Sequence, residues 1–250
     1  MSIDSLAGQK ISFLTYDTGE STRVRRAGSG GASLNPANGT IVQVMTNDDP
    51  GPVQQNGIQA NVGVYTEPTT LPAKSATFNT QAASSGDVVA TFSKIHLKGN
   101  FYNAFRGGPS TASTGGAGGG PGGGGGPGGG PGGSQEGKNL VLTMDDCTLS
   151  GVVSTATAKH RVSKISSANY QEIGRITNTA HPVINNGVLV TLKNGSTWQV
   201  AGTSYLTSLT LDRGSKVVAA TGNLTVTVDG KAHDVTPGST VTVAIVVSVA

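Results

Sequence analysis

Two stretches of the chain, one on each side of a glycine-rich segment, align with each other without gaps. The first runs from Val88 to Phe101 and the second from Leu140 to Val153. The matched pairs are Thr91 with Thr143, Phe92 with Met144, Ile95 with Cys147, Leu97 with Leu149, Gly99 with Gly151, and Phe101 with Val153. A third, partial copy begins at Val188 and resumes at Trp198 after a short Asn-Gly-Ser turn. An internal repeat of this kind favours a stacked, repetitive architecture.

The spacing of the copies indicates the kind of stack. Thr91 and Thr143 are about 52 positions apart, and removing the roughly 31 residues of the glycine-rich segment leaves about 21, which is the size of one coil of a parallel β-helix. The short runs after Tyr205 alternate apolar and polar residues and end at Gly, Asn or Asp, as strands do. We therefore expect an all-β fold, a right-handed parallel β-helix (solenoid), over residues 87–250.

The glycine-rich segment, residues 107–137, is expected to be an insertion between two coils. It holds no large apolar side chain, so it is either a flexible linker or an ordered glycine sheet packed against a neighbouring backbone. Thr155 to Pro182 contains either a short helix or a long excursion. Residues 1–86 are strand-rich and form either the first coils or an assembly segment.

Composition excludes several classes of protein. Only 12% of the residues are charged and the net charge is +3, while Val and Thr abound, which is not a disordered profile. The basic residues are scattered apart from Arg23, Arg25 and Arg26, so we expect no nucleic-acid partner. No apolar run is long enough to span a membrane. The first ten residues show no export signal, which is expected of a cytoplasmic chain or of a mature or recombinant form.

From Asp87 onward the chain resembles the secreted or surface parallel β-helix repeat proteins of anaerobic Firmicutes, which have no assigned enzymatic activity. The matching segments are IHLKGNFYNAFRGG, KNLVLTMDDCTLSGVVSTATAKH, NNGVLVTLKNGSTWQVAGTSYLTSLTLD and VTVDG. The resemblance implies export, a β-helix, and an extracellular or cell-surface location with a structural role. It supplies no catalytic residues.

Enzymes with this fold place carboxylates and basic residues on one exposed face. The candidates here are Asp145, Asp146, Lys159, His160 and Arg161. Asp145 and Asp146 align with Ser93 and Lys94 in the first copy, which predicts a solvated turn between strands. Asn47-Asp48-Asp49 does not complete a calcium loop. We therefore expect no enzyme, no metal and no cofactor.

Other single residues are expected to be structural. His96, His160, His181 and His233 have no metal-ligand spacing, and a surface position is expected for them. Cys147 should be a buried small hydrophobe. Trp198 is a candidate sugar-stacking platform, but its alignment with inward-facing Ile95 and Cys147 favours a place in the core. Asn38, Asn194 and Asn223 match the glycosylation pattern, which an Asn- and Thr-rich chain also produces by chance.

The C-terminal run from Val241 to Ala250 carries no charge and is expected to leave an open strand edge. Asp229-Gly230 predicts a tight hairpin, so the last two strands could form an antiparallel cap. An open edge invites pairing with another copy. The expected assembly interface consists of Val241, Val243, Ile245, Val247, Val249, Gly122, Gly125 and Gly128.

The expected function is that of a structural subunit of an extracellular fibre or surface layer, which assembles with itself as a homo-oligomer or filament. The alternative is a carbohydrate-binding adhesin that recognises cell-surface glycans. A polysaccharide lyase or hydrolase is the third alternative, and it would need a charged groove that the alignment does not supply.

Overall fold

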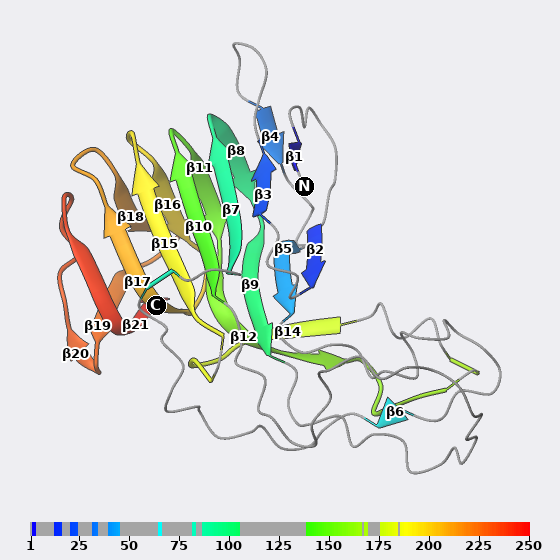
Figure 1. The fold of residues 1–250 in the computed structure, drawn as a ribbon. Coiled ribbons are helices and arrows are strands. Elements are labelled where there is room, and N and C mark those ends of the chain that lie inside the picture. The colour runs from blue at the N-terminus through cyan, green and yellow to red at the C-terminus, as the bar shows by residue number, and fades with distance from the viewer. Residues whose placement is uncertain are drawn as a thin grey trace.

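The computed structural model describes residues 82–83, 87–105, 139–166, 168–169, 176–184 and 186–250. It also describes the backbone of six short strands before residue 67. Every regular element in these residues is a β-strand (Figure 1). The strands are β1 Ser2–Ile3, β2 Phe13–Tyr16, β3 Ser21–Val24, β4 Ala32–Leu34, β5 Thr40–Met45, β6 Tyr65–Thr66, β7 Val88–Ser93, β8 Ile95–Lys98, β9 Asn100–Phe105, β10 Leu140–Asp145, β11 Thr148–Gly151, β12 Val153–His160, β13 Lys164–Ile165, β14 Ile176–Ala180, β15 Val188–Lys193, β16 Thr197–Val200, β17 Ser204–Leu211, β18 Lys216–Ala219, β19 Leu224–Val228, β20 Lys231–Ala232 and β21 Thr240–Val249.

The strands form three large sheets, in which most neighbours are parallel. Sheet A has the order β1-β3-β7-β10-β15-β17-β21-β19-β20. Sheet B has the order β14-β12-β9-β5-β2, and sheet C has the order β18-β16-β11-β8-β4. Along the chain, β7, β8 and β9 enter sheets A, C and B in turn, and β10, β11 and β12 repeat that order. The expectation of an all-β fold with parallel strands is therefore confirmed.

The register of the sheets matches the alignment of the first two copies. Thr91 lies beside Thr143, Leu97 beside Leu149, and Phe101 beside Val153. The third copy continues the row, because Thr143 lies beside Thr191. The glycine-rich segment therefore separates two strands, β9 and β10, that belong to successive, in-register repeats.

The expected alignment of Trp198 is wrong by two residues. Trp198 lies beside Leu149, while the residue that contacts Cys147 is Ser196, whose hydroxyl accepts a hydrogen bond from the Cys147 amide at 3.0 Å. The expected match of Trp198 with Cys147 needs three extra residues in the turn after β15, but the registers Asp145–Lys193 and Leu149–Trp198 show only one. In this turn Asn194 and Gly195 both have positive φ, 54° and 78°. The corresponding turn after β10 has a single such residue, Asp146.

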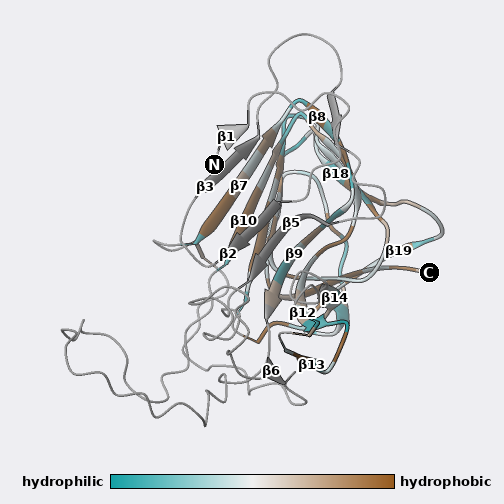
Figure 2. Cartoon of the chain, turned by 90° about the vertical axis from the view of Figure 1, so that its right-hand side faces the viewer, coloured by the Kyte–Doolittle hydropathy of each residue, from teal (hydrophilic) through white to brown (hydrophobic). Residues whose placement is uncertain are grey.

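The core follows from period-two alternation. In β7, β10 and β15 every second residue is buried, and these side chains stack on their counterparts in the next strand. Figure 2 shows the resulting hydrophobic stretches along β7 and its neighbours. The fully buried side chains of largest volume are Trp198, Phe92, Phe101, Leu140, Leu142, Met144, Leu149, Leu192 and Leu206.

The first five strands of the chain, β1 to β5, join the same sheets, while β6 pairs with β13 in a separate two-stranded sheet. β3 pairs with β7, β4 with β8, and β5 with β9, all in parallel. This pairing is the one expected of a preceding repeat. The region after Thr155 forms an excursion, because β12 turns back through the antiparallel strand β14, and none of its described residues is helical.

The C-terminal strands fold back on sheet A. β19 and β20 form the expected tight hairpin at Asp229-Gly230, and both turn residues have positive φ. β21 pairs antiparallel with β17 on one side and with β19 on the other. The expectation that β21 leaves an open edge is therefore wrong, while the expected antiparallel cap is confirmed.

A strained residue lies in β21. Two residues of β21, Val243 and Ala244, oppose the single residue Thr207 of β17, so the pairing contains a β-bulge. Val243 has a φ of 86°, a conformation that is costly for a β-branched side chain, and it is 40% exposed.

We expect Val243→Gly to raise the free energy of unfolding by about 1 kcal/mol, because it removes the backbone strain of a residue with little packing to lose. Chemical denaturation measures this change. Val246→Gly on the same strand is the matched control and should lower stability, since Val246 is not among the residues of positive φ. Destabilisation by Val243→Gly as large as that by Val246→Gly would contradict the account.

Candidate functional site

A row of threonines crosses the outer face of sheet A. Five successive strands, β7, β10, β15, β17 and β21, place a threonine at the same register. The row is Thr91, Thr143, Thr191, Thr210 and Thr240. At its end the hydroxyl oxygens of Thr210 and Thr240 lie 3.1 Å apart, within hydrogen-bonding distance. These side chains alternate with the buried residues, so they point away from the core.

An aliphatic row runs beside the threonines. Val89, Val141 and Leu189 lie in register on β7, β10 and β15, and all three are only partly buried. Within β7, β10, β15, β17 and β21 neither row contains a charged residue, and on β3 the residue in register with Thr91 is Arg23. We call these eight residues, the five threonines and the three aliphatic residues, the threonine face. Figure 1 shows sheet A turned toward the viewer.

A polar corner borders the threonine face on its other side. The Lys193 ammonium lies 3.2 Å from Asp145 Oδ2, and the Asn194 side-chain amide donates to Asp145 Oδ1 at 2.6 Å. The Asn194 backbone amide in turn donates to Asp212 Oδ2. These contacts join the ends of β10, β15 and β17 into one network.

The network lowers the pKa of two carboxyl groups. The hydrogen bond from the Asn194 side chain is the main cause of the lowered pKa of Asp145, and Lys193 adds to it. The Ser215 side chain, followed by the backbone amide of Asn194, lowers the pKa of Asp212. Both carboxylates are therefore expected to serve as structural acceptors at neutral pH.

These shifts predict an acid-sensitive contribution to stability. Carboxyl groups whose pKa is lower in the folded chain stabilise it above their ordinary pKa of 3.8, and this contribution is lost as the pH falls through the lowered values. Urea unfolding across acidic pH should show stability falling below about pH 4. Asp145→Asn and Asp212→Asn should each make this fall shallower; an unchanged pH profile in both would contradict the assignment.

Buried polar side chains form hydrogen bonds where the chain re-enters sheet A. Asp87, 5% exposed, accepts hydrogen bonds from the Asn139 backbone and side-chain amides at 2.9 and 3.1 Å. Asn186 donates to the carbonyl oxygens of Asn103 at 2.8 Å and Ala156 at 3.1 Å. Hydrogen bonds of this kind stabilise the start of β10 and of β15.

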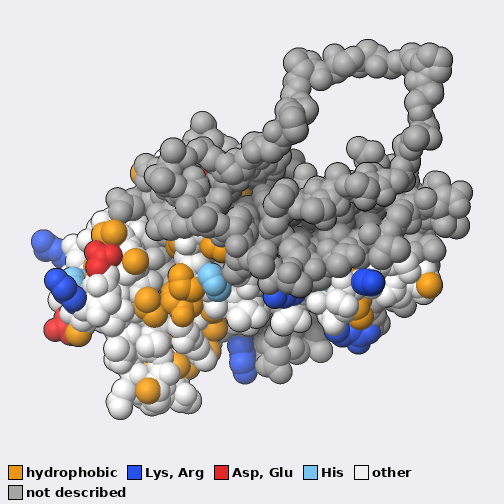
Figure 3. Space-filling model, turned by 90° about the horizontal axis from the view of Figure 1, so that it is seen from below, with side chains coloured by type: hydrophobic (Ala, Val, Ile, Leu, Met, Phe, Trp, Pro, Cys, Tyr) orange, Lys and Arg blue, Asp and Glu red, His pale blue; other side chains and the backbone are white. Residues whose placement is uncertain are grey.

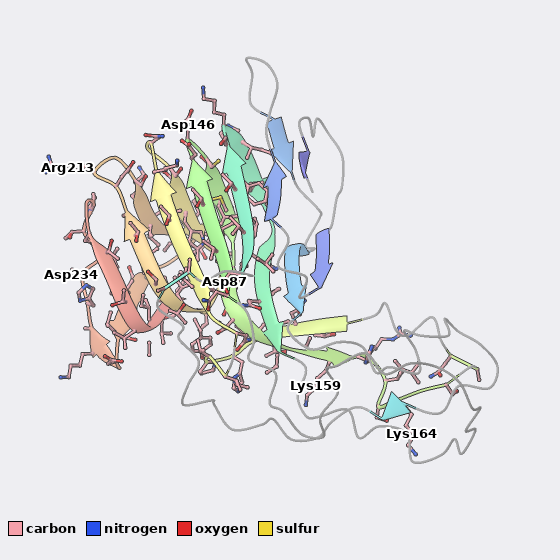
Figure 4. The ribbon with its side chains drawn as sticks, in the orientation of Figure 1. Asp87, Asp146, Lys159, Lys164, Arg213 and Asp234 are labelled. Carbon is pink, nitrogen blue, oxygen red and sulfur yellow. The ribbon has the colours of Figure 1, made fainter. Side chains whose placement is uncertain are left out.

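The residues considered for a lyase do not come together. Asp145 and Asp146 lie at the turn between β10 and β11, and Asp146 is exposed with a φ of 54°, so the expected turn is confirmed. Lys159 and His160 end β12 in sheet B. Figure 4 shows Asp146 and Lys159 at opposite ends of the molecule.

The other single residues mostly follow expectation. Cys147 is buried, and burial raises the pKa of its thiol. Trp198 is fully buried and donates to the Gly151 carbonyl at 3.0 Å, so it cannot be a sugar platform. His96 is exposed as expected. His160 is only 7% exposed, so a surface position is wrong for it, although its neighbour Lys159 on the other face of β12 is exposed.

The expected assembly residues separate into three groups. Val241, Ile245 and Val247 are buried in the core, and Val249 is partly buried against it. Val243 is exposed at the bulge. Gly122, Gly125 and Gly128, together with Arg25, Arg26 and Asn47–Asp49, lie outside the described residues. Sequence reasoning missed the threonine face, although the aligned copies already matched Thr91 with Thr143.

The rest of the surface formed by the described residues holds no cluster of metal-ligating side chains. Among them, no three His, Cys, Asp or Glu side chains gather into a group that could hold a metal ion. Their Lys and Arg side chains are spread along the face seen in Figure 3. These residues form no helix with the length and apolar character needed to cross a membrane.

Comparisons with known proteins leave the family open. No protein-family model matches the chain. No curated protein matches it, and no solved structure matches it. The resemblance to surface β-helix proteins of anaerobic Firmicutes therefore stays a prediction.

Proposed function

We propose that the three sheets are the faces of a right-handed parallel β-solenoid, and that the chain is a structural subunit of an extracellular fibre or surface layer. The solenoid is supported by the repeated passage of the chain through sheets A, C and B. Right-handedness is the general rule for parallel crossover connections.

One observation supports the structural role: polar and titratable side chains form hydrogen bonds and ion pairs between successive strands. Asp145 binds Lys193 and Asn194, Asp87 binds Asn139, and Trp198 binds the backbone of the preceding repeat. The outer face of sheet A carries a regular row of threonines over five strands, bordered by the Asp145–Lys193 pair. A scaffold that associates through a repetitive surface has these properties.

The position of β21 changes where self-association is expected. Since β21 and β19 continue sheet A beyond β17, that sheet now ends on β19 and the two-residue strand β20, which begins with exposed Lys231. The edge of sheet C at this end is β18, which has only four residues and begins with exposed Lys216. A short edge with a lysine resists further pairing, so we place the contacts between subunits on the sides of the solenoid.

The proposal is tested on the full chain by sedimentation velocity and negative-stain electron microscopy from micromolar to millimolar concentration. We expect association that increases with concentration, and ordered assemblies at the upper end. A chain that stays monomeric over this whole range, with no ordered particles, would refute the structural-subunit proposal.

A further inference from the structure

The threonine face has two properties that solvation alone does not require. Its threonines keep one register over five strands, and a continuous row of Val89, Val141 and Leu189 lies beside them. Cross-strand threonine pairs stabilise a sheet by themselves, which accounts for the first row. Threonine pairing does not account for the second row, whose aliphatic side chains stay partly exposed. A row of apolar side chains on an outer sheet face is a candidate contact surface.

The face is complementary to itself about one axis. Consider a two-fold axis that runs parallel to the strands, midway between β10 and β15, and brings a second copy face to face with the first. This operation places β10 of each copy opposite β15 of the other. Thr143 then opposes Thr191, and Val141 opposes Leu189.

The same operation pairs the charges that border the face. Asp145 is the last residue of β10 and Lys193 the last of β15, and the two lie side by side in register. Across the axis the Asp145 carboxylate of one copy meets the Lys193 ammonium of the other, twice. Isologous interfaces have this property, in which residue i meets residue j and j meets i.

We propose that the threonine face is the site at which a second copy of this chain binds, sheet against sheet, about this two-fold axis. The proposal rests on the self-assembling role proposed above and names one surface that contributes to it, by joining two copies in a closed pair. Aligned sheets pack about 10 Å apart with their strands within about 30° of each other, which fits side chains of the size of Thr, Val and Leu.

The size of the face sets the strength of the pair. Under this axis β7 lies opposite β17, so β7, β10, β15 and β17 overlap. Four strands about 4.8 Å apart and about six residues of about 3.3 Å each give roughly 19 by 20 Å, or about 380 Å² per copy. A standard stable interface buries about 800 Å² per partner. The pair is therefore weak, with a dissociation constant in the micromolar range or above, and the electrostatic contacts at its border make it weaker in high salt.

The experiment compares two double variants of the full chain by sedimentation equilibrium. Thr143→Lys with Thr191→Lys introduces four ammonium groups into the centre of the paired face. Thr148→Lys with Thr197→Lys is the matched control, because these threonines are also neighbours in register and partly buried, but on the outer face of sheet C. Fluorescence of Trp198 confirms that both variants keep the fold, since it is the only tryptophan.

The inference predicts that the sheet A variant raises the dissociation constant of the pair at least about tenfold, because unpaired charges are costly to bury, while the sheet C variant leaves it within about twofold. Equal association of wild type and sheet A variant would overturn the face assignment and leave the structural role standing. A monomeric wild type would overturn both. Binding of monomeric wild type, but not of the sheet A variant, to insoluble polysaccharide would also overturn the inference and make a glycan the occupant.

Discussion

Replacing Gly151 with alanine is expected to destabilise the fold by about 3 kcal/mol or more, the upper end of the usual cost of overpacking. A Cβ atom at this position would lie 1.8 Å from the carbonyl oxygen of Gly99 in the preceding repeat. That oxygen belongs to the backbone and cannot rotate away. The corner is also held on both sides by hydrogen bonds, Gly99 to Ser150 and Trp198 to Gly151, at 2.9 and 3.0 Å.

Gly202→Ala is the control for this prediction. A Cβ at Gly202 would lie 3.2 Å from a methyl group of Val152, which can move, so the expected loss is below about 1 kcal/mol. Urea unfolding followed by Trp198 fluorescence measures both variants. If Gly151→Ala were no more destabilising than Gly202→Ala, the close stacking of the two repeats at Gly99 and Gly151 would be wrong.

Replacing Trp198 with alanine is expected to cost about 4 kcal/mol, within the range found for truncation of large aromatic residues in a core. Trp198 is fully buried and lies over Leu149, so its removal leaves a cavity between two repeats. It also removes the hydrogen bond to Gly151. Circular dichroism during denaturation measures the change, because the variant has no tryptophan fluorescence.

Trp198→Phe separates the two contributions. It keeps most of the apolar volume but loses the indole donor, and the Gly151 oxygen still accepts from the Ala201 amide at 3.3 Å. We therefore expect a loss of about 1 to 2 kcal/mol. A mild effect of Trp198→Ala, comparable with that of the phenylalanine variant, would indicate that Trp198 lies at the surface and would reopen its role as a sugar platform.

The sequence was most informative where the repeats are local and regular. The matched pairs from Thr91–Thr143 to Phe101–Val153 appear as neighbours in the sheets, because inward residues must stack on inward residues. The alignment failed at Trp198, because it needed three extra residues in the turn after β15, where the structure has one. A one-residue change in a turn leaves no trace in the hydrophobic pattern of the strands around it.

The long-range features were harder to predict. The alternating run from Val241 to Val249 indicates a strand but not its partners, and an antiparallel return between β17 and β19 is decided by packing at the end of the core. The burial of His160 depends on neighbours far away in the sequence. The threonine face could have been found from the aligned copies by asking which matched residues face outward.

The most direct test of the central claim, in-register stacking across the glycine-rich segment, is a distance between spin labels at Thr91 and Thr240. Labels are attached to cysteines at these two positions in a Cys147→Ala background, and the sample is diluted with unlabelled chain to suppress signals between copies. Four steps of about 4.8 Å predict a narrow distribution near 19 Å. A broad distribution, or one centred well beyond about 30 Å, would contradict the stacked arrangement of β7, β10, β15, β17 and β21.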